Sequence, residues 1–517
     1  MKNSAKNVLL IILDGWGISN EKKGNPTILA KTPNIDYYTK NYSSTKLYSH
    51  GRNVGLPGNQ DGNSEAGHLN IGAGRRVLQD SFFISDSIKS KTFFKNTAFI
   101  EAIKHAKKYK TKMHLIGLLS GNESPHMSPS HLYALMELAK KEKISPVVLH
   151  LFTDGRDSSQ HGAIKFLKNL EKNFKNDEVV ASIIGRVYAM DRKKKWENIE
   201  KTYNLIVCGE GEKAQSAKDA IRQAYNKKLT DEFITPYIIA KNGKPAETVN
   251  DNDVVMFFNL RSDRARELTK AFTQENFNEM NQGSFKRKKI PKNIRFVAMT
   301  DFGPDLPNVL TAYPSRNIKN TLPFALKGFS QLYVSETEKY AHVTYFFNGG
   351  YSELVANEER IHIPSPNANN YVDVPEMSLP AVAKILKEKI KLKKYNFICV
   401  NFNNPDMIGH TGNLKAGIKC CEIVDKYLGD VMSLALKNNF NSIITADHGN
   451  IEEMINLKTN EIDTKHSKNL VPFILVGDNF KNRKINFKEG MLCNIAPTIL
   501  KLMKIKKPKE MTSESLI

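Results

Sequence analysis

The sequence has few cysteines and no long hydrophobic run. Its 517 residues include five cysteines, two of them adjacent (Cys420 and Cys421), and no CxxC spacing. Neither a disulfide framework nor a zinc-finger site is therefore indicated. The longest apolar run, VLLIIL at 8–13, is far too short to cross a bilayer. Because a strand is expected almost at the start, no room is left for a signal or transit peptide. We expect a cytoplasmic protein that does not bind membranes.

Acidic residues are outnumbered by basic ones, and the formal net charge is +22. The excess lysines are spread along the chain, with local clusters at 192–195, 286–289 and 504–509. No basic run contains interleaved aromatic residues, and no nucleic-acid-binding module is recognisable. A solvated, lysine-rich surface is the favoured interpretation, with nucleic-acid binding as the alternative. We expect no nucleic-acid partner, and an acidic small-molecule substrate also fits this charge.

Three apolar runs, distant in sequence, each end in an aspartate. The runs VLLIILD, FICVNFNNPD and SIITAD end at Asp14, Asp406 and Asp447. Short runs rich in β-branched residues are typical of strands buried on both faces of a parallel sheet. Ligands gather at the carboxyl ends of such strands. Three carboxylates at that edge would form a negative pocket, which is unfavourable unless cations fill it.

Histidines accompany these acids in the same part of the chain. They are His410 in PDMIGH, His448 in ADHGN and His466 in DTKHSKNLVPF. Any one of them alone is more typical of an ordinary hydrogen-bonded histidine, but the grouping with three aspartates favours a metal site. Carboxylates and imidazoles without cysteine suit Mn²⁺, with Zn²⁺ as the alternative. With Ser64 as a further oxygen ligand, the set suffices for two divalent ions.

Ser64 lies in the glycine-rich segment GNQDGNSEAGHLNIGAGR at 58–75. Glycines let a backbone approach phosphate closely, and a metal-ionised serine can attack phosphorus. The simpler interpretation is a capping or turn serine before a short helix. The segment is not a Walker A loop, because no GK[ST] follows.

The middle of the chain alternates predicted strands and helices, which favours a parallel α/β domain. The metal-type residues all lie outside this part. We therefore expect an insertion at 79–313 within a discontinuous domain formed by 1–78 and 314–517, rather than one large α/β domain.

Most of the chain's candidate anion-binding residues follow predicted strands of this insertion, where doubly wound domains bind ligands. They are Arg156, Asp157, Arg186, Arg192, Arg261 and Arg264. Guanidinium groups suit carboxylate and phosphate recognition, although surface salt bridges would explain any single one. Asp157 should be ionised among these cations and could act as a base or position a hydroxyl. His126 is a possible partner. Lys339, before a further expected apolar strand, could neutralise a phosphate or simply be solvated.

The chain resembles the cofactor-independent phosphoglycerate mutases, members of the alkaline-phosphatase-like metalloenzymes, over essentially its whole length. The resemblance rests on LDGWG, GNSEAGHLNIGAGR, TDGRD, GRVYAMDR, RSDRARE, ETEKYAHVTYFFNGG, NNPDMIGH and TADHGN, in family order. It implies an α/β fold with an alkaline-phosphatase-like, metal-binding parallel-sheet domain. A second α/β phosphotransferase domain, which binds substrate, would be inserted into it.

The resemblance also implies an isomerase of glycolysis that interconverts 3-phosphoglycerate and 2-phosphoglycerate without 2,3-bisphosphoglycerate, through a phosphoserine at Ser64. Two Mn²⁺ ions are implied, with Zn²⁺, Co²⁺ or Mg²⁺ as alternatives. One ion would be held by Asp406, His410 and His466, and the other by Asp14, Ser64, Asp447 and His448. Ser64, Asp157 and Lys339 would be catalytic. The substrate would be bound by His126, Arg156, Asp157, Arg186, Arg192, Arg261, Arg264 and Lys339. A monomer is expected.

The loop around His126 departs from the family pattern. It reads SGNESPHMSP, where the family usually has SDGGVHSH, and is one residue longer. A two-metal phosphohydrolase on the same fold is the main alternative function. The arginine set argues against it, because simple hydrolysis does not require an alcohol to be held for return transfer.

Overall fold

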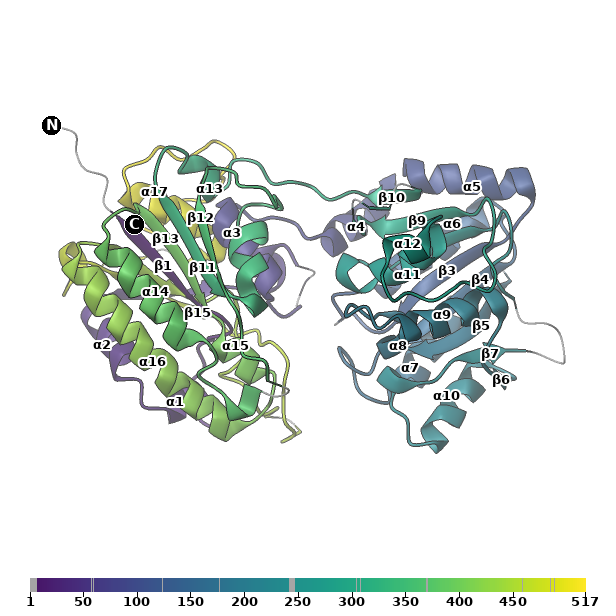
Figure 1. The fold of residues 1–517 in the computed structure, drawn as a ribbon, viewed down its shortest axis with the longest axis horizontal. Coiled ribbons are helices and arrows are strands. Elements are labelled where there is room, and N and C mark those ends of the chain that lie inside the picture. The colour runs from purple at the N-terminus through teal and green to yellow at the C-terminus, as the bar shows by residue number, and fades with distance from the viewer. Residues whose placement is uncertain are drawn as a thin grey trace. The chain divides into compact units, whose positions relative to one another are not determined.

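The computed structural model describes residues 7–517 except 57, 59, 123, 176, 241–246, 304, 307, 369–370, 458, 484 and 488. The first six residues of the expected first domain therefore lie outside the described part. The chain divides into two compact units, each with its own hydrophobic core. Unit 1 comprises Met1–Gln79 and Arg316–Ile517, and unit 2 comprises Asp80–Ser315 (Figure 1). Unit 2 covers nearly the same residues as the insertion expected at 79–313.

Unit 1 is built on a mainly parallel sheet with the order β12-β11-β13-β1-β14-β15-β2-β16. Its centre is β1 (Val8–Leu13), which pairs in parallel with β13 (Phe397–Phe402) and β14 (Asn441–Thr445). All residues of these three strands are buried, as their uninterrupted apolar runs predict. The other strands are β12 (Glu359–Ile363), β11 (Gln331–Glu336), β15 (Val471–Val476), β2 (Ser43–Tyr48) and β16 (Gly490–Met491). Antiparallel pairing occurs at β14–β15 and β15–β2.

Amphipathic helices cover this sheet. The long helix α16 (Leu414–Lys437) buries residues three or four apart along one face, including Cys421, Val424 and Leu428. It packs against α14 (Leu379–Lys391), and both cross the sheet in Figure 1. The remaining helices are α1 (Pro26–Leu29), α2 (Pro33–Asn41), α3 (Ser64–Ala73), α13 (Leu322–Ala325), α15 (Asn404–Gly409) and α17 (Ile495–Leu502).

Unit 2 has a second mainly parallel sheet with the order β10-β9-β8-β3-β4-β5-β7-β6, in which β5–β7 is the antiparallel pair. Its strands are β3 (Met113–Leu119), β4 (Val147–Thr153), β5 (Glu178–Gly185), β6 (Glu212–Ala214), β7 (Tyr237–Ile239), β8 (Val254–Phe257), β9 (Arg295–Thr300) and β10 (Val309–Tyr313). Its helices are α4 (Asp80–Lys89), α5 (Thr97–Tyr109), α6 (Pro129–Lys141), α7 (Ala163–Glu171), α8 (Arg186–Ala189), α9 (Trp196–Cys208), α10 (Ala217–Asn226), α11 (Arg266–Thr273) and α12 (Phe277–Met280). The expected α/β class with parallel-rich sheets is confirmed.

One predicted strand is absent from the structure at its expected place, so that prediction is wrong. The apolar run after Lys339 was expected to form a strand, but His342–Phe346 forms a π-helix, η7. Aromatic and β-branched residues favour strands locally. Here η7 packs against α3, and a Cβ at Gly72 would overlap the Phe347 carbonyl. This close packing of backbone overrides the local preference.

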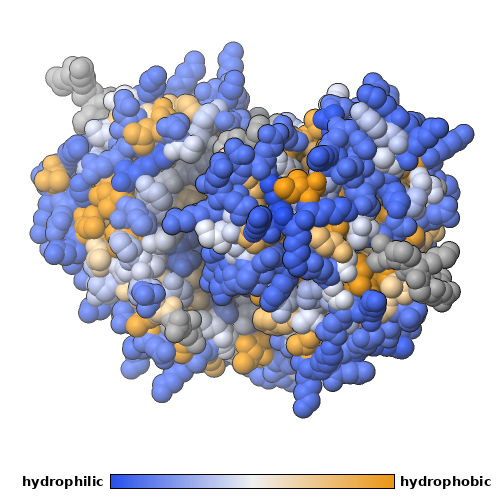
Figure 2. Space-filling view, turned by 45° about the vertical axis from the view of Figure 1, so that its right-hand side comes forward, coloured by the Kyte–Doolittle hydropathy of each residue, from blue (hydrophilic) through white to orange (hydrophobic). Residues whose placement is uncertain are grey.

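Hydrophilic residues predominate on the face shown in Figure 2, and hydrophobic residues are scattered among them. Among the described residues, no helix is long and apolar enough to cross a membrane.

Candidate metal centre and cationic cluster

Three buried aspartates converge at one edge of the unit 1 sheet. Asp14 directly follows β1, and Asp447 follows β14. Asp406 does not end its strand as expected but lies in the first turn of α15, shortly after β13. Because Leu13 pairs with Phe402 and Ile12 pairs with Thr445, the three neighbouring strands end at nearly the same level. The predicted concentration of carboxylates at this edge is therefore present.

Lys339 lies among these carboxylates. Its Nζ is 2.6 Å from Asp14 Oδ1, 2.6 Å from Asp406 Oδ2 and 2.5 Å from Ser64 Oγ. The side chain is held by the turn η6 (Thr337–Lys339), which directly follows β11. Burial opposes its charge, but the surrounding carboxylates raise the pKa of the Lys339 ammonium above its usual range. The lysine is a buried cation rather than a solvated one.

The carboxylates retain unbalanced negative charge despite this lysine. Burial and the neighbouring Asp447 raise the pKa of Asp14 to about 6. Burial also opposes ionisation of Asp406, but Lys339 and His410 hold its pKa well below the usual range. The pKa of Asp447 is likewise lowered by His448 and His68 against the effect of burial. One cation does not fully compensate three buried carboxylates, so the pocket favours additional positive charge.

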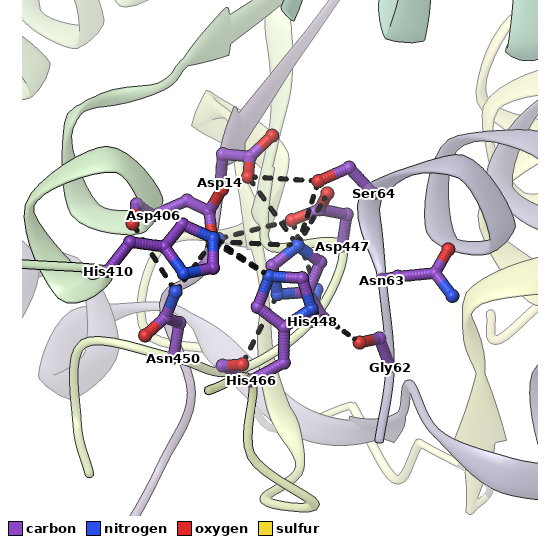
Figure 3. Close-up of polar contacts among 12 residues, drawn as sticks. Asp14, Gly62, Asn63, Ser64, Asp406, His410, Asp447, His448, Asn450 and His466 are labelled. Atoms are coloured by element: carbon purple, nitrogen blue, oxygen red, sulfur yellow. Dashed lines mark hydrogen bonds and ion pairs between the residues drawn. The ribbon is translucent and has the colours of Figure 1, made fainter. Parts of the chain in front are cut away.

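The three histidines make the same kind of hydrogen bond, and all three lie beside the aspartates in Figure 3. In each, Nδ1 faces a backbone carbonyl: Thr464 for His410 at 2.8 Å, Gly449 for His448 at 3.2 Å and Gly62 for His466 at 2.8 Å. Since a carbonyl only accepts, Nδ1 carries the proton and Nε2 presents a lone pair in the neutral ring. Metal-ligating histidines are typically oriented in this way.

These Nε2 atoms gather around the aspartates. His410 Nε2 and His466 Nε2 lie 3.2 Å apart, and 3.4 and 3.3 Å from Asp406 Oδ1. Two lone pairs at this distance require a proton or a cation between them. Burial lowers the pKa of His466 to about 4, which keeps this ring neutral at physiological pH.

Two groups of ligand atoms could each hold a metal ion. The atoms of Asp14, Asp447 and His448 all lie within 4.8 Å of one another, as do those of Asp406, His448 and His466. The donor set of carboxylate oxygens and imidazole nitrogens fits a divalent transition metal. His448 belongs to both groups, whereas the sequence assigned it to one ion.

Ser64 is the first residue of α3, with Asn63 as the N-cap. Its Oγ lies 2.9 Å from His448 Nε2 and 3.4 Å from Asp14 Oδ1. At Gly62 and Gly67, an added Cβ would overlap Ser49 and Asp447, so these glycines allow close packing of the protein backbone. The hydroxyl therefore lies at a helix N-terminus that favours anions, beside both metal-type groups.

Sequence reasoning missed several residues that orient these ligands. Asn401 Nδ2 lies 2.6 Å from Asp14 Oδ2 and 3.0 Å from His68 Nε2, and His68 Nδ1 lies 2.9 Å from the Ser64 carbonyl. Asn450 Nδ2 donates to Asp406 Oδ1 at 2.8 Å. All three lie inside motifs quoted above, but their partners could be found only from the tertiary structure.

In unit 2, candidate ligand-binding side chains follow four neighbouring parallel strands. Arginines follow β8, β4 and β5, and His126 follows β3. Arg186, at the end of β5, is buried and lies 2.6 Å from both Asp154 Oδ1 and Asp157 Oδ2. Asp157 Oδ2 also accepts from Ser124 Oγ at 3.1 Å and lies 3.9 Å from His126 Nε2. Burial and neighbouring arginines hold the pKa of His126 well below its usual range, so this ring is neutral. The structure thus places His126 beside Asp157 and Arg186 in spite of the altered loop.

Three further candidate arginines of unit 2 are linked to one another or to Arg186. Arg264 donates to the Met190 carbonyl at 3.2 Å, and burial together with Arg186 and Arg192 lowers its pKa to about 10. Arg192 and Arg261 both pair with Asp263, at 3.1 and 3.6 Å. Arg156 is the outlier, since its half-exposed side chain lies 3.6 Å from Glu232. Mutual repulsion among these guanidinium groups would be relieved by an anionic ligand.

Comparisons with known proteins agree with this chemistry. Residues 84–304 match the family model described as BPG-independent PGAM N-terminus. The 2,3-bisphosphoglycerate-independent phosphoglycerate mutases of Acetivibrio thermocellus and Clostridioides difficile are 43% and 44% identical to this chain, over 99% of both chains in each case. A crystal structure of Leishmania mexicana phosphoglycerate mutase at low cobalt concentration matches 100% of this chain and 98% of its own, with 30% identity and a TM-score of 0.83. The resemblance inferred from the motifs is confirmed, and the chain belongs to the 2,3-bisphosphoglycerate-independent phosphoglycerate mutases.

Proposed function

We propose that this isomerase interconverts 3-phosphoglycerate and 2-phosphoglycerate by intramolecular phosphoryl transfer through a phosphoserine at Ser64. The observation that carries the proposal is the position of the Ser64 hydroxyl. It lies at the N-terminus of α3, 2.5 Å from the Lys339 ammonium and beside both metal-type groups. Such surroundings stabilise a negatively charged oxygen and an attached phosphoryl group. The family name adds that 2,3-bisphosphoglycerate is not needed.

In the first half of the reaction, Ser64 Oγ forms a bond to phosphorus while the bond from phosphorus to the substrate's O3 breaks. The serine proton is lost and O3 of the departing glycerate gains one, which gives phosphoserine and glycerate. In the second half, the glycerate 2-hydroxyl attacks phosphorus and the bond to Ser64 Oγ breaks. Lys339 donates a hydrogen bond to Oγ and offsets the charge on this oxygen as its bond to phosphorus forms and breaks.

We infer that Asp406, His410 and His466 would hold one divalent ion, and Asp14, Ser64, Asp447 and His448 the other. The place of His448 in both groups of ligand atoms, and the Nε2 atoms that the three histidines direct towards the aspartates, support two adjacent ions. When bound, the ions would neutralise phosphoryl charge and lower the pKa of the serine hydroxyl. Mn²⁺ is our proposed metal, with Zn²⁺, Co²⁺ or Mg²⁺ as alternatives.

We propose that the substrate is bound in unit 2 by five arginines and the neutral His126, because guanidinium groups pair well with carboxylate and phosphate. The arginines are Arg156, Arg186, Arg192, Arg261 and Arg264. In unit 1, Lys339 would bind the phosphoryl group of the substrate. Asp157 would receive the glycerate hydroxyls, because its carboxylate accepts hydrogen bonds and is held by Arg186. A cytoplasmic location and a monomeric state stay predictions.

A coupled assay with 3-phosphoglycerate, run beside a measurement of free phosphate, tests this function. We expect 2-phosphoglycerate to form without added bisphosphoglycerate and with little phosphate release. A chelator should abolish the activity and Mn²⁺ should restore it, because the buried carboxylates and histidines would lose their ions. Phosphate appearing as fast as substrate disappears would favour the two-metal phosphohydrolase instead.

A further inference from the structure

Glu452 is a buried carboxylate that lies outside both candidate metal groups but adjoins them. It is 1% exposed and accepts four hydrogen bonds. Its Oε2 accepts from the backbone N–H groups of Gly17 and Asn450, each at 2.9 Å. Its Oε1 accepts from Ser467 Oγ and, at 3.0 Å, from Asn469 Nδ2. Four bonds fill the acceptor capacity of one carboxylate.

The four donors come from three separate chain segments, and each segment carries candidate metal ligands. Gly17 lies three residues after Asp14. Asn450 follows Asp447 and His448, and its side chain also donates to Asp406 Oδ1 at 2.8 Å. Ser467 directly follows His466. One side chain therefore joins the segments that supply most of the candidate ligands.

Two glycines of the quoted motifs have their explanation here. A Cβ at Gly17, the second glycine of LDGWG, would overlap the Glu452 carboxylate. A Cβ at Gly449, the glycine of ADHGN, would overlap both Glu452 Oε1 and Ser467 Oγ. Neither glycine has the positive φ that would require glycine for backbone reasons. The Glu452 carboxylate occupies the space that a side chain would need, which explains glycine at both positions.

We propose that Glu452 is a positioning residue for the metal centre: it holds the three ligand-bearing segments in register and thereby sets the affinity for divalent ions. This inference rests on the metal binding proposed above. Residues that orient metal ligands typically contribute about 10–100-fold to metal affinity. A carboxylate suits the task because all four surrounding groups are donors.

Glu452→Gln tests the role with little change in volume. The amide replaces one acceptor oxygen by an NH₂ group, which cannot accept the two hydrogen bonds that this oxygen received. We expect Mn²⁺ affinity, measured by calorimetric titration of the metal-stripped protein, to fall by about 10–100-fold. Glu453→Gln is the matched control, because Glu453 is partly exposed and, among the described residues, its carboxylate accepts one side-chain hydrogen bond, from Asn469 Nδ2 at 3.0 Å. This control should keep the affinity of the unchanged protein.

Ser467→Ala is a milder second test in case Glu452→Gln does not fold. It removes one of the four hydrogen bonds and leaves the Glu452 carboxylate in place. We expect this variant to keep its far-ultraviolet circular dichroism and to bind Mn²⁺ more weakly than the unchanged protein, but more tightly than Glu452→Gln. If Glu452→Gln does not fold, the Ser467→Ala affinity decides the question. Folded variants that bind Mn²⁺ as tightly as the unchanged protein would overturn this inference alone. An unchanged protein that binds none of Mn²⁺, Zn²⁺, Co²⁺ and Mg²⁺ would overturn the proposed function and this inference with it.

Discussion

At the scale of single residues, Lys339 is the buried counter-charge of two carboxylates in unit 1. Its ammonium contacts Asp14, Asp406 and the Ser64 hydroxyl, and all four side chains are buried. A buried charge that loses its partner is costly because the protein interior solvates it poorly. Lys339 therefore stabilises the folded pocket, in addition to its role in the proposed reaction.

Replacing this lysine should destabilise the metal-free protein more than the metal-loaded one. In the presence of a chelator, we expect Lys339→Met to lower the free energy of unfolding by about 3–5 kcal/mol, which is the usual cost of leaving a buried charge unpaired. Mn²⁺ should then raise the melting temperature of the variant more than that of the unchanged protein. Lys23→Met, at an exposed lysine, is the control. Equal melting temperatures of Lys339→Met and the unchanged protein in chelator would contradict the role of Lys339 as counter-charge.

Several residues of the site could be predicted from the sequence and several could not. Asp14 and Asp447 follow uninterrupted apolar runs, so their place at a sheet edge is a local property of the chain. Asn401 and Glu452 have no such signal, because their partners lie far along the chain. Asn401 bonds Asp14 across 387 residues, and Glu452 bonds Gly17 across 435. Only the pairing of β1 with β13 and β14 brings these groups together.

At the scale of secondary-structure elements, strands buried on both faces were the most predictable. Their runs of four to eight apolar residues have few alternatives in a parallel α/β sheet. The π-helix η7 was not predictable, because its composition favours a strand and its packing against α3 decides otherwise. The simpler interpretation of Ser64 as a capping serine is wrong, because Asn63 is the N-cap of α3 and Ser64 is its first helical residue. This helix start places the Ser64 hydroxyl beside Lys339.

The packing of α6 against α4 in unit 2 contains an acid-sensitive contact. His131 of α6 is fully buried, and its Nε2 lies 2.9 Å from Ser85 Oγ of α4. Ser85 donates to the Ser81 carbonyl, so His131 Nε2 carries the proton, and its Nδ1 has no partner among the described residues. Burial lowers the pKa of His131 to about 4, from an ordinary value of 6.5. A second proton on this ring would be buried and unpaired.

Unit 2 should therefore lose stability as pH falls from about 6.5 to 4. In this range His131 takes up a proton in the unfolded chain but stays neutral in the folded one. A shift from 6.5 to about 4 at about 1.4 kcal/mol per unit corresponds to about 3.5 kcal/mol at most. His131→Asn should make the loss of stability between pH 7 and pH 5 smaller. Since the two tryptophans are Trp16 and Trp196, fluorescence in a Trp16→Phe background follows urea unfolding of unit 2 alone.

The exposed His161 of unit 2 provides the control, and His161→Asn should keep the acid sensitivity of the parent. A His131→Asn protein whose urea midpoint falls with pH as steeply as that of its parent would contradict the role assigned to the buried ring.

At the scale of the whole molecule, two kinds of chemistry are distributed over two units. Unit 1 carries the carboxylates, the imidazoles and Ser64, and unit 2 carries the buried Arg186 and its cationic neighbours. Each set lies at the carboxyl ends of adjacent parallel strands, which is the usual ligand-binding edge of such sheets. The sequence predicts an inserted middle segment, because the metal-type motifs occur only on either side of it. The orientation of side chains within each set could not be predicted, since it depends on long-range pairs.

The central claim is that the phosphoryl group passes through Ser64. Trypsin should cut after Arg52 and Arg75, and the peptide between them contains Ser64 as its only hydroxyl-bearing side chain. Mass spectrometry of this peptide, from enzyme quenched in acid during turnover of 3-phosphoglycerate with Mn²⁺, tests the claim directly. We predict one added phosphoryl group on the peptide and none in Ser64→Ala, which should also lose mutase activity. An unmodified peptide during active turnover, or a Ser64→Ala enzyme that retains appreciable mutase activity, would contradict the account.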